Sequence, residues 1–518
     1  MWNFPYDAAM SMDKRDHITL KTIRRVWSVF FMALFLFFLF SADFSRMKGY
    51  QVGLFLQADP LVWLAGLFTG WTVYTGMALA LLVIIPTLFL GRFFCSWICP
   101  LGIMNQWLSR LMPGRRAVED YSMNEYRPLY RMKYYILAAL LSLAAMGSLQ
   151  IGLFDPIALI HRSFIISVGP AADLAAGAIY TRPPVFLGGV LIALLFVTLI
   201  LANRQYPRFW CRTLCPLGAL LGVISLGSVY RIRRDVDRCT DCNKCLRGCQ
   251  GACDPQGALR VAECHVCMNC IQDCPEDALT FGPPLARSSI HAPLDVNRRR
   301  VIETAVAAAV LYPMMKSSLT GETTAQAAVI RPPGSLAEPD FLRRCIKCAM
   351  CMRACPTNVL QPALLEAGFE GLWTPVLINR IGWCESHCVM CGQVCPTGAI
   401  KPLTVQQRAG TPGKTEPVRL GTAFYDRGRC LPWAMNVECI VCEEVCPTSP
   451  KAIWFEMKEI KNRDGSTRTL KMPYMDPKLC IGCGICENKC PVRDKAAIRV
   501  TSVGETRSKT NRMLLGGN

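Results

Sequence analysis

Histidine is scarce in this chain of 518 residues, which contains five. None lies inside a long apolar segment, so paired histidine ligation of a haem within a membrane is excluded. No Cys-x-x-Cys-His motif occurs, which excludes covalently attached c-type haem. The sequence also has no glycine-rich nucleotide fingerprint and no molybdenum-binding architecture.

Acidic residues are also few: 38 Asp and Glu face 57 Lys and Arg, for a net charge of +19. So large a basic excess occurs in nucleic-acid-binding proteins, but here no stripe of basic and aromatic residues accompanies it. Lys and Arg instead flank apolar segments, as they do at the cytoplasmic ends of membrane helices. We therefore expect a membrane protein that does not bind nucleic acid.

Cysteine, in contrast, is abundant, with 29 residues. Most lie in Cys-x-x-Cys-x-x-Cys-x-x-x-Cys runs, a spacing typical of iron–sulfur ligands and not of disulfides. Hydrophobic residues make up 52% of the chain, and they concentrate in about the first 205 residues. The predicted fold class is an α-helical polytopic membrane domain built from duplicated helical hairpins, followed by α+β ferredoxin-like domains, one with two clusters and one with four.

Four apolar segments are each about long enough to cross a hydrocarbon core: residues 26–40, 71–90, 135–154 and 185–202. A further apolar stretch, residues 52–69, is interrupted by Asp59-Pro60, and we expect it to be re-entrant or interfacial. The loop after the second segment holds seven Arg and Lys residues, whereas the loops after the first and third segments hold two each. Because basic loops stay inside, the N-terminus, this loop and the region after the fourth segment are predicted to be cytoplasmic.

The apolar half is internally repeated. The stretch Gly91-Arg-Phe-Phe-Cys95-Ser-Trp-Ile-Cys99-Pro recurs as Pro207-Arg-Phe-Trp-Cys211-Arg-Thr-Leu-Cys215-Pro. Two hairpins related by a pseudo-two-fold axis along the membrane normal would explain the repeat. The four thiols of these CxxxCP elements suit a metal or cluster, two redox-active dithiols, or simply a packed helix end. These three interpretations stay open, and the residues concerned are Cys95, Cys99, Cys211 and Cys215.

An Asp-Pro pair precedes each CxxxCP element, at Asp59-Pro60 and Asp155-Pro156. Ionisable groups at membrane depth are candidates for function, here as proton acceptors near a quinol. The alternative interpretation is that both aspartates cap helices before a proline.

The first two cysteine runs have the spacing of a two-cluster bacterial ferredoxin, in which the fourth cysteine of each run ligates the other cluster. Gln250 replaces the usual proline after the first run, so Cys253 is an alternative to Cys249 as a ligand. The predicted ligands are Cys239, Cys242, Cys245 and Cys274 for cluster A, and Cys264, Cys267, Cys270 and Cys249 for cluster B.

Four more runs follow, and their sixteen thiolates are enough for four further [4Fe–4S] clusters, six in all. They are Cys345, Cys348, Cys351, Cys355; Cys384, Cys388, Cys391, Cys395; Cys430, Cys439, Cys442, Cys446; and Cys480, Cys483, Cys486, Cys490. The outer runs are regular and the inner two are stretched, which favours a nested arrangement. The first run would exchange its last cysteine with the fourth run, and the second with the third; sequential pairing is the alternative. His265 and His387 lie inside runs, and we expect them to hydrogen-bond ligands and not to replace them.

Between these regions, Asn297-Arg-Arg-Arg-Val-Ile-Glu303 and the apolar run after it resemble an internal twin-arginine export signal; a short basic-flanked anchor is the alternative. Such a signal suits a domain that acquires clusters in the cytoplasm and is exported folded. Ala325-Gln-Ala327 resembles a signal-peptidase site, where cleavage would give two polypeptides. The predicted parts are a cytoplasmic segment (1–25), the four-helix membrane domain (26–222), a cytoplasmic two-cluster domain (231–285), the signal or anchor helix (297–316), a periplasmic four-cluster domain (331–500) and a flexible tail (501–518).

These motifs resemble known families. Residues 15–285 look like NapH, the membrane ferredoxin-type subunit of periplasmic nitrate reductase systems, and MauN and NosR proteins share the membrane motif. Residues 298–500, with the twin arginines, Arg331-Pro-Pro-Gly334 and Cys345-Ile-Lys-Cys348, look like NapG and MauM. The chain thus resembles a NapH–NapG fusion.

The resemblance implies a multi-pass protein of the bacterial cytoplasmic membrane that takes electrons from the quinol pool and passes them to a periplasmic redox enzyme or cytochrome. A cytoplasmic donor reaching clusters A and B is the alternative source of electrons. The alternative function is a maturation factor that supplies electrons for cofactor assembly in a periplasmic enzyme.

Overall fold

The computed structural model describes residues 20–44, 51–70, 76–111, 121–171, 185–283, 292–316, 329–410, 415–461 and 465–511. The predicted cleavage site at Ala325–Ala327 and part of the predicted basic loops lie outside these residues. The chain forms two compact units. Unit 1 comprises Met1–Phe37, Leu79–Ala138 and Val197–Ile302, and unit 2 comprises Phe38–Ala78, Ala139–Phe196 and Glu303–Asn518.

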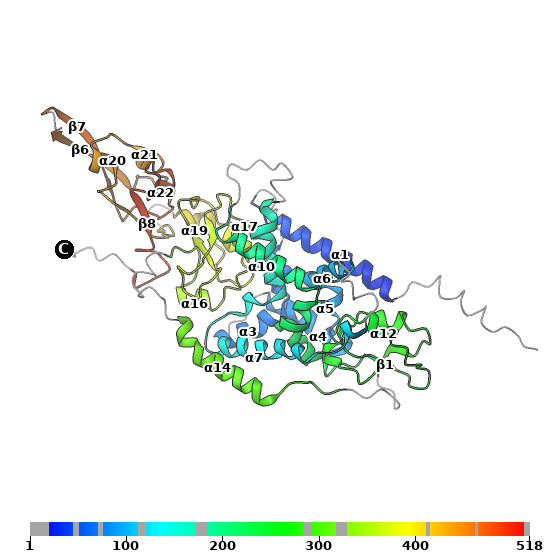
Figure 1. Cartoon of the computed structure of the whole chain (residues 1–518). Helices are drawn as coiled ribbons and strands as arrows, with labels where there is room; N and C mark the ends of the chain where they lie inside the picture. The colour runs from blue at the N-terminus through cyan, green and yellow to red at the C-terminus, as the bar shows by residue number, and fades with distance from the viewer. Residues whose placement is uncertain are drawn as a thin grey trace, which may run out of the picture. The chain divides into compact units, whose positions relative to one another are not determined.

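The division between the units runs through several helices, so the expected membrane domain (26–222) contributes residues to both units. The divided elements, all labelled in Figure 1 except η1, are α1 (Leu20–Ser41), η1 (Met77–Ala80), α7 (Met132–Ala145), α10 (Gly189–Ala202) and α14 (Arg298–Lys316). In consequence, the CxxxCP elements share unit 1 with the first two cysteine runs. Both Asp-Pro elements share unit 2 with the four later runs.

Among the residues described, unit 1 consists of mostly short helices and one two-stranded antiparallel sheet, β1–β2, which pairs Arg231 with Gly282 and brackets the first two cysteine runs. Its elements are α4 (Leu81–Leu90), α5 (Phe94–Trp97), α6 (Pro100–Leu111), η2 (Tyr121–Asn124), η3 (Pro128–Arg131), η6 (Trp210–Leu214), α11 (Pro216–Ser225), β1 (Arg231–Arg234), α12 (Lys244–Arg247), η7 (Val261–Glu263), α13 (Asn269–Gln272) and β2 (Leu279–Gly282).

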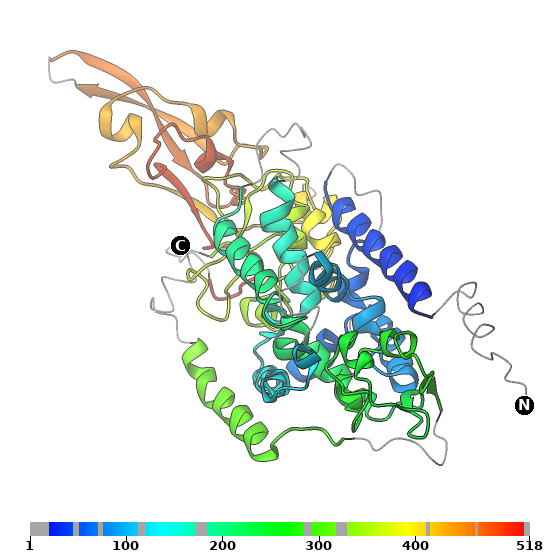
Figure 2. The same ribbon diagram turned by 45° about the vertical axis from the view of Figure 1, so that its right-hand side comes forward.

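Unit 2 has three two-stranded antiparallel sheets among the residues described, β3–β4, β5–β8 and β6–β7. The β6–β7 hairpin, orange in Figure 2, pairs nine residues on each strand. The elements are α2 (Leu54–Gln57), α3 (Pro60–Gly70), η4 (Ile151–Leu153), α8 (Pro156–Ser163), η5 (Phe164–Val168), α16 (Glu338–Leu342), α17 (Met350–Arg353), β3 (Leu360–Pro362), β4 (Pro375–Leu377), α18 (Met390–Gln393), α19 (Val405–Ala409), β5 (Thr422–Tyr425), α20 (Leu431–Met435), α21 (Val441–Glu444), β6 (Ile453–Lys461), β7 (Thr467–Met475), α22 (Ile485–Lys489) and β8 (Ile498–Thr501).

All four X-Pro dipeptides of the internal repeat begin helices. Asp155 caps α8, where its carboxylate accepts from the N–H groups of Ile157 and Ala158 at 2.9 and 2.7 Å. The Cys215 sulfur caps α11 in the same way, accepting from Gly218 N. Proline at the first helical position suits these starts, because its fixed φ matches the helix and the missing N–H is not needed there.

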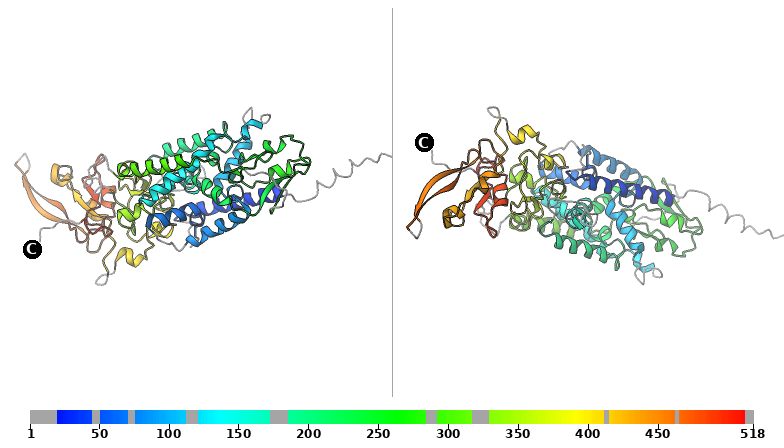
Figure 3. Two further views of the ribbon diagram at one scale, coloured as in Figure 1. Left: turned by 90° about the horizontal axis from the view of Figure 1, so that it is seen from below. Right: turned by 90° about the horizontal axis from the view of Figure 1, so that it is seen from above.

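One helix among those described, α1, is long and apolar enough to cross a membrane, and it coincides with the first predicted span. It is the long dark-blue helix in Figure 3. The third predicted span, 135–154, is not one helix: α7 ends at Ala145, and Gly147 follows with a φ of +90°, a conformation that ends helices. Helices α4 and α10 lie within the second and fourth predicted spans but have 10 and 14 residues.

Candidate metal centres

Five cavities are each lined by four cysteines that come from two different runs. They are site A (Cys239, Cys242, Cys245, Cys274), site C (Cys345, Cys348, Cys351, Cys395), site D (Cys384, Cys388, Cys391, Cys355), site E (Cys430, Cys439, Cys442, Cys490) and site F (Cys480, Cys483, Cys486, Cys446). The rest of the lining is mainly apolar at sites C to F, whereas Arg234, Gln256 and Glu276 also line site A, and no histidine contributes to any of the five. Four sulfurs around one apolar cavity fit a [4Fe–4S] cube, which needs a thiolate for each iron.

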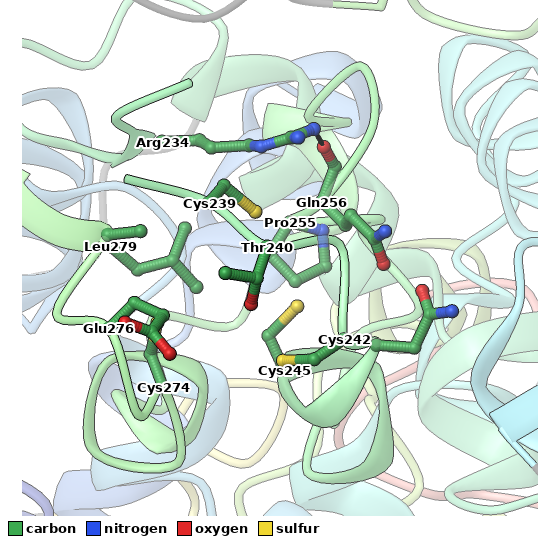
Figure 4. Close-up of a pocket in the computed structure, with 12 residues that line it drawn as sticks. Arg234, Cys239, Thr240, Cys242, Cys245, Pro255, Gln256, Cys274, Glu276 and Leu279 are labelled. Carbon is green, nitrogen blue, oxygen red and sulfur yellow. Dashed lines mark hydrogen bonds between the residues drawn. The ribbon is translucent and has the colours of Figure 1, made fainter. Parts of the chain in front are cut away.

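Site A, shown in Figure 4, takes three cysteines from the loop before and within α12 and one from the segment after α13. The Arg234 guanidinium holds this loop by donating to the main-chain oxygen of Gln256 and to the Asp241 carboxylate. Cys242 is exposed, whereas Cys274 is buried. Site A therefore lies near the surface of unit 1.

The other four cysteines of the first two runs form site B, and Cys253 joins them there as a fifth buried thiol. The five are Cys249, Cys253, Cys264, Cys267 and Cys270. The sulfurs of Cys249 and Cys253 are 3.5 Å apart, and the Cys253 thiol lowers the pKa of Cys249 to about 6 by hydrogen bonding. Cys249 interacts electrostatically with Cys267 and Cys270, while Cys253 hydrogen-bonds Cys249 and Cys264. Cys253 thus lies among the site B thiols, and Cys249, which has the ferredoxin spacing, stays the predicted fourth ligand with Cys253 as the alternative.

The nested pairing of the four later runs is wrong. Sites C and D exchange Cys355 and Cys395, and sites E and F exchange Cys446 and Cys490, so the pairing is sequential. The physical reason lies in the strands: β5 directly precedes the third run, β8 directly follows the fourth, and the two strands pair with each other. Their pairing closes the third and fourth runs into one module.

The regular runs share a backbone conformation that wraps three thiols around one cavity. In each, the residue before the second cysteine and the residue after it have a positive φ. The pairs are Asp241 and Asn243, Val266 and Met268, Lys347 and Ala349, and Gly482 and Gly484. The last pair is glycine, which adopts this conformation freely, and Asp241 and Asn243 are residue types that also tolerate it, so the sequence signals the conformation in two runs of four.

Charged side chains approach the sulfurs of two sites in unit 2. The fully buried Arg408 guanidinium donates to Cys384 Sγ of site D at 3.7 Å and to the Val418 oxygen. Lys347, between two cysteines of site C, is 2% exposed and donates to the main-chain oxygen of Glu370 and to Gln150 Oε1. Burial lowers the pKa of Lys347 to about 7. The sequence contains no local pattern that marks either cation.

Within unit 1, the structure brings the four CxxxCP cysteines together as buried thiols that interact electrostatically. Several N–H groups point at their sulfurs: Arg92 Nη2 to Cys95 at 3.9 Å, Asn105 Nδ2 to Cys211 at 3.6 Å and Gly218 N to Cys215 at 3.2 Å. Among the residues described, no three His, Cys, Asp or Glu side chains are close enough to share one metal ion.

The equivalent arginines of the two repeats, Arg92 and Arg208, both reach the start of the second cysteine run. Arg92 donates to the Ala262 oxygen and lies 3.7 Å from the Glu263 carboxylate, while Arg208 contacts His265 Nδ1 at 3.1 Å. Burial lowers the pKa of His265 well below its usual value, so its neutral ring accepts this hydrogen bond. His265 thus holds an arginine, and it lines none of the five cavities. The second histidine, His387, bonds Ser386.

Asp59 and Asp155 lie in unit 2 as helix caps, as the second interpretation of these residues expected. Both side chains are fully buried, and Asp59 Oδ1 accepts from Leu61 N at 2.8 Å. The two carboxyl groups interact electrostatically, and each has one buried oxygen, Asp59 Oδ2 and Asp155 Oδ1, without a hydrogen-bond partner among the residues described.

Comparison with known proteins agrees with this geometry. A family model described as a 4Fe-4S binding domain matches residues 72–119 and 185–234, which contain the CxxxCP elements, and a second of the same description matches residues 473–493. A methylamine utilization ferredoxin-type protein, MauM of Methylorubrum extorquens, is 34% identical over 40% of this chain and 90% of its own length. The chain belongs to the family of ferredoxin-type proteins that includes MauM and NapG.

NapG of Escherichia coli is 31% identical over 33% of this chain and 69% of its own length, and NapH of the same organism also matches. The putative electron transport protein YccM of E. coli is 31% identical over 40% of this chain, which spans about half (55%) of that protein. No solved structure matches. The 4Fe-4S family models, the ferredoxin-type relatives and the cysteine-lined sites together identify the chain as an iron–sulfur electron-transfer protein.

Proposed function

We propose that this protein is a membrane-bound electron conduit with six [4Fe–4S] clusters at sites A to F, which takes electrons from quinol and delivers them to a periplasmic oxidoreductase through the four clusters at sites C to F. The observation that carries the proposal is the set of five cavities, each lined by four cysteines from two runs. Site B, with four of its five thiols as ligands, would hold the sixth cluster. The CxxxCP thiols stay candidates for an additional redox centre or cluster.

The contacts within unit 2 support an electron path through four sites in the order C, D, F, E. Sites C and D share two cysteine runs, as do sites F and E. Sites D and F meet where Cys384 N donates to the Cys483 oxygen at 2.8 Å. Site C is the end of this path that lies against residues 152–162, which we call the Asp-Pro segment because they contain Asp155-Pro156. Arg162 of this segment donates to the main-chain oxygens of Gly152 and Lys347. Electrons from a membrane donor would therefore enter at site C and leave at site E.

Exposed apolar side chains support the membrane embedding. Large apolar residues with at least a third of their surface exposed gather on four helices: Val26, Trp27, Val29, Phe30 and Phe37 on α1; Leu81, Leu82, Ile85, Leu88 and Phe89 on α4; Val190, Leu191, Leu194, Leu195 and Leu201 on α10; and Ile302, Val306, Val310, Leu311 and Met314 on α14. Surfaces of this kind are suited to lipid. We propose several membrane passes, with sites A and B in the cytoplasm and sites C to F in the periplasm.

Quinol reduction of the purified, full-length protein tests the conduit. Under anaerobic conditions, reduced quinol should bleach the cluster absorbance of the wild type. Cys348→Ser, which removes a ligand of site C, should stop quinol from reducing sites D, F and E while dithionite still reduces them. Cys253→Ser is the matched control, because this buried thiol lies outside the proposed ligand set, and it should behave like the wild type. Failure of quinol to reduce any wild-type cluster would end the quinol proposal.

Topology and pathway need separate measurements. Protease added to intact spheroplasts should digest residues 331–500 but leave residues 231–285 intact, and the opposite pattern would refute the orientation. A deletion strain distinguishes the conduit from the maturation factor. A conduit deletion leaves the partner enzyme complete and reducible by artificial donors, whereas a maturation deletion leaves that enzyme without its cofactor.

A further inference from the structure

The second residue after each exchanged cysteine of unit 2 lines the cavity that this cysteine serves. In three sites this residue is a threonine, within the sequence Cys-Pro-Thr. Its Oγ1 lies at hydrogen-bonding distance from the exchanged sulfur: 3.9 Å for Thr397 at site C, 3.6 Å for Thr357 at site D and 3.3 Å for Thr448 at site F. At site E the equivalent residue is Val492, which lines the cavity without a hydroxyl group.

Site E receives a hydroxyl group from elsewhere. Tyr425, the last residue of β5, lines the same cavity, and its phenol oxygen lies 3.0 Å from Cys442 Sγ. This is the shortest of the four hydroxyl–sulfur contacts. Each site of unit 2 therefore has one hydroxyl group against one of its sulfurs, although the residue that supplies it differs at site E.

The direction of these hydrogen bonds follows from the chemistry of the ligands. A cysteine that binds iron is a thiolate without a proton, so the hydroxyl group must be the donor. Thr448 is well placed to donate, since its oxygen accepts from Ala452 N at 2.9 Å and its proton stays available for Cys446. Thr357 also lies against the Trp383 oxygen, which competes for its proton. Tyr425 and Thr448 are therefore the strongest of the four donors.

A hydrogen bond to a ligand sulfur stabilises the more negative, reduced cluster and so raises its reduction potential. We propose that Tyr425 sets the potential of the cluster at site E, in place of the threonine that serves sites C, D and F. The proposal rests on the cluster assignment made above. Without this donor, site E would be harder to reduce than site F and would hold back electrons that arrive from it.

Redox titration of the full-length protein, followed by electron paramagnetic resonance, tests this role. In Tyr425→Phe, one cluster per protein should be about tenfold less reduced at a fixed potential, a shift of about 59 mV for a one-electron couple. The remaining clusters should titrate as in the wild type. Tyr474→Phe is the matched control, because it removes the phenol oxygen of a neighbouring strand that accepts from Lys458 and touches no sulfur in the structure.

A rescue experiment separates donation to sulfur from a merely structural role. Val492→Thr in the Tyr425→Phe background recreates the Cys-Pro-Thr sequence at site E and should restore most of the lost potential. A purely structural role for the phenol would not be rescued by a hydroxyl group two residues from Cys490. In the wild-type background, Val492→Thr adds a second donor and should raise the potential of the same cluster.

Iron content separates this inference from the proposed function. If wild-type protein lacks a cluster at site E, so that Cys439→Ser loses no iron, the cluster assignment itself fails. If Tyr425→Phe keeps its full iron and every cluster titrates as in the wild type, only the role of Tyr425 is overturned. If Tyr425→Phe loses iron, the single variant Val492→Thr in the wild-type background decides the question. A raised potential of the site E cluster supports tuning by hydroxyl groups, and an unchanged potential refutes it.

Discussion

The two units hold their cysteine modules against the apolar segments in different ways. In unit 1 the contact is a buried ion-pair network: Glu263, next to site B, accepts from Lys133 and from Tyr134, and Arg92 lies near the same carboxylate. In unit 2 the buried cations at the contact face neutral oxygens, as where Arg162 donates to the Gly152 oxygen. In unit 1 the cations lie in direct contact with a carboxylate, whereas in unit 2 Arg162 and Lys347 hydrogen-bond neutral oxygens and interact with Asp155 and Glu370 only electrostatically.

Close approach of the backbone replaces the ion pairs in unit 2. A Cβ atom on Gly152 would lie 1.9 Å from the Ile346 oxygen, between the first two cysteines of site C. No side chain fits there without movement of one backbone. The comparison teaches that charge fixes the cysteine module of unit 1 to its apolar segment, whereas shape fixes the module of unit 2. Different substitutions should therefore release the two modules.

The largest effect, a loss of iron, is expected at site B of unit 1, where Cys249 and Cys253 compete for one ligand position. Cys249→Ser should lose site B, about four of the roughly 24 irons of six cubes, because Cys249 has the ferredoxin spacing and interacts electrostatically with Cys267 and Cys270. Cys253→Ser should keep its iron. Iron and sulfide analysis of both purified variants measures this. The reverse result would make Cys253 the ligand, and equal retention would mean that either thiol serves.

The second-largest effect is expected when the carboxylate is removed from the ion-pair network of unit 1. Glu263→Gln leaves Lys133 and Arg92 buried without a counter-charge, which costs about 3–5 kcal/mol. The thermal midpoint for loss of cluster absorbance should fall accordingly. Asp235→Asn, which breaks the exposed pair with Arg238, is the control and should cost under about 1 kcal/mol. A midpoint unchanged by Glu263→Gln would show that charge does not hold this contact.

Gly152→Ala makes the matching change in unit 2. The new methyl group must push the site C loop from the Asp-Pro segment, at a cost of about 1–3 kcal/mol, and quinol should reduce the clusters more slowly. Gly428→Ala is the control, because its Cβ would meet only Asp426 Oδ1 at 3.5 Å. Identical quinol reduction rates in the two variants would contradict entry of electrons at site C.

The sequence predicted the chemistry of the sites better than their geometry. Cysteine spacing is a local property, so the ligand types and the site A quartet could be read directly. The pairing of the later runs could not, because it depends on β5 meeting β8 across about 75 residues. The cations near the sulfurs were also missed: Arg408 lies in an ordinary helical stretch and reaches Cys384 only after folding. Tyr425 gave no signal except the missing threonine at position 492.

The smallest effect is expected from an ion pair inside the four-run region, away from the contact with the Asp-Pro segment. Burial alone would raise the pKa of Glu338, but the guanidinium groups of Arg331 and Arg507, at 2.5 and 2.7 Å, hold it at about 2. A lowered pKa stabilises the fold above the unfolded value of about 4.5, and this contribution is lost as the pH falls toward 2.

Glu338→Gln should therefore cost about 1–2 kcal/mol at pH 7, less than a fully buried pair because the carboxylate is 29% exposed. The gap between variant and wild type in thermal midpoint should begin to narrow below about pH 4.5, and a pH series from 7 to 4 measures it. Quinol reduction should be unchanged, since this pair does not touch the Asp-Pro segment. A pH-independent gap would mean that Glu338 acts by packing, and slower quinol reduction would mean that charge also governs the contact of unit 2 that we attribute to shape.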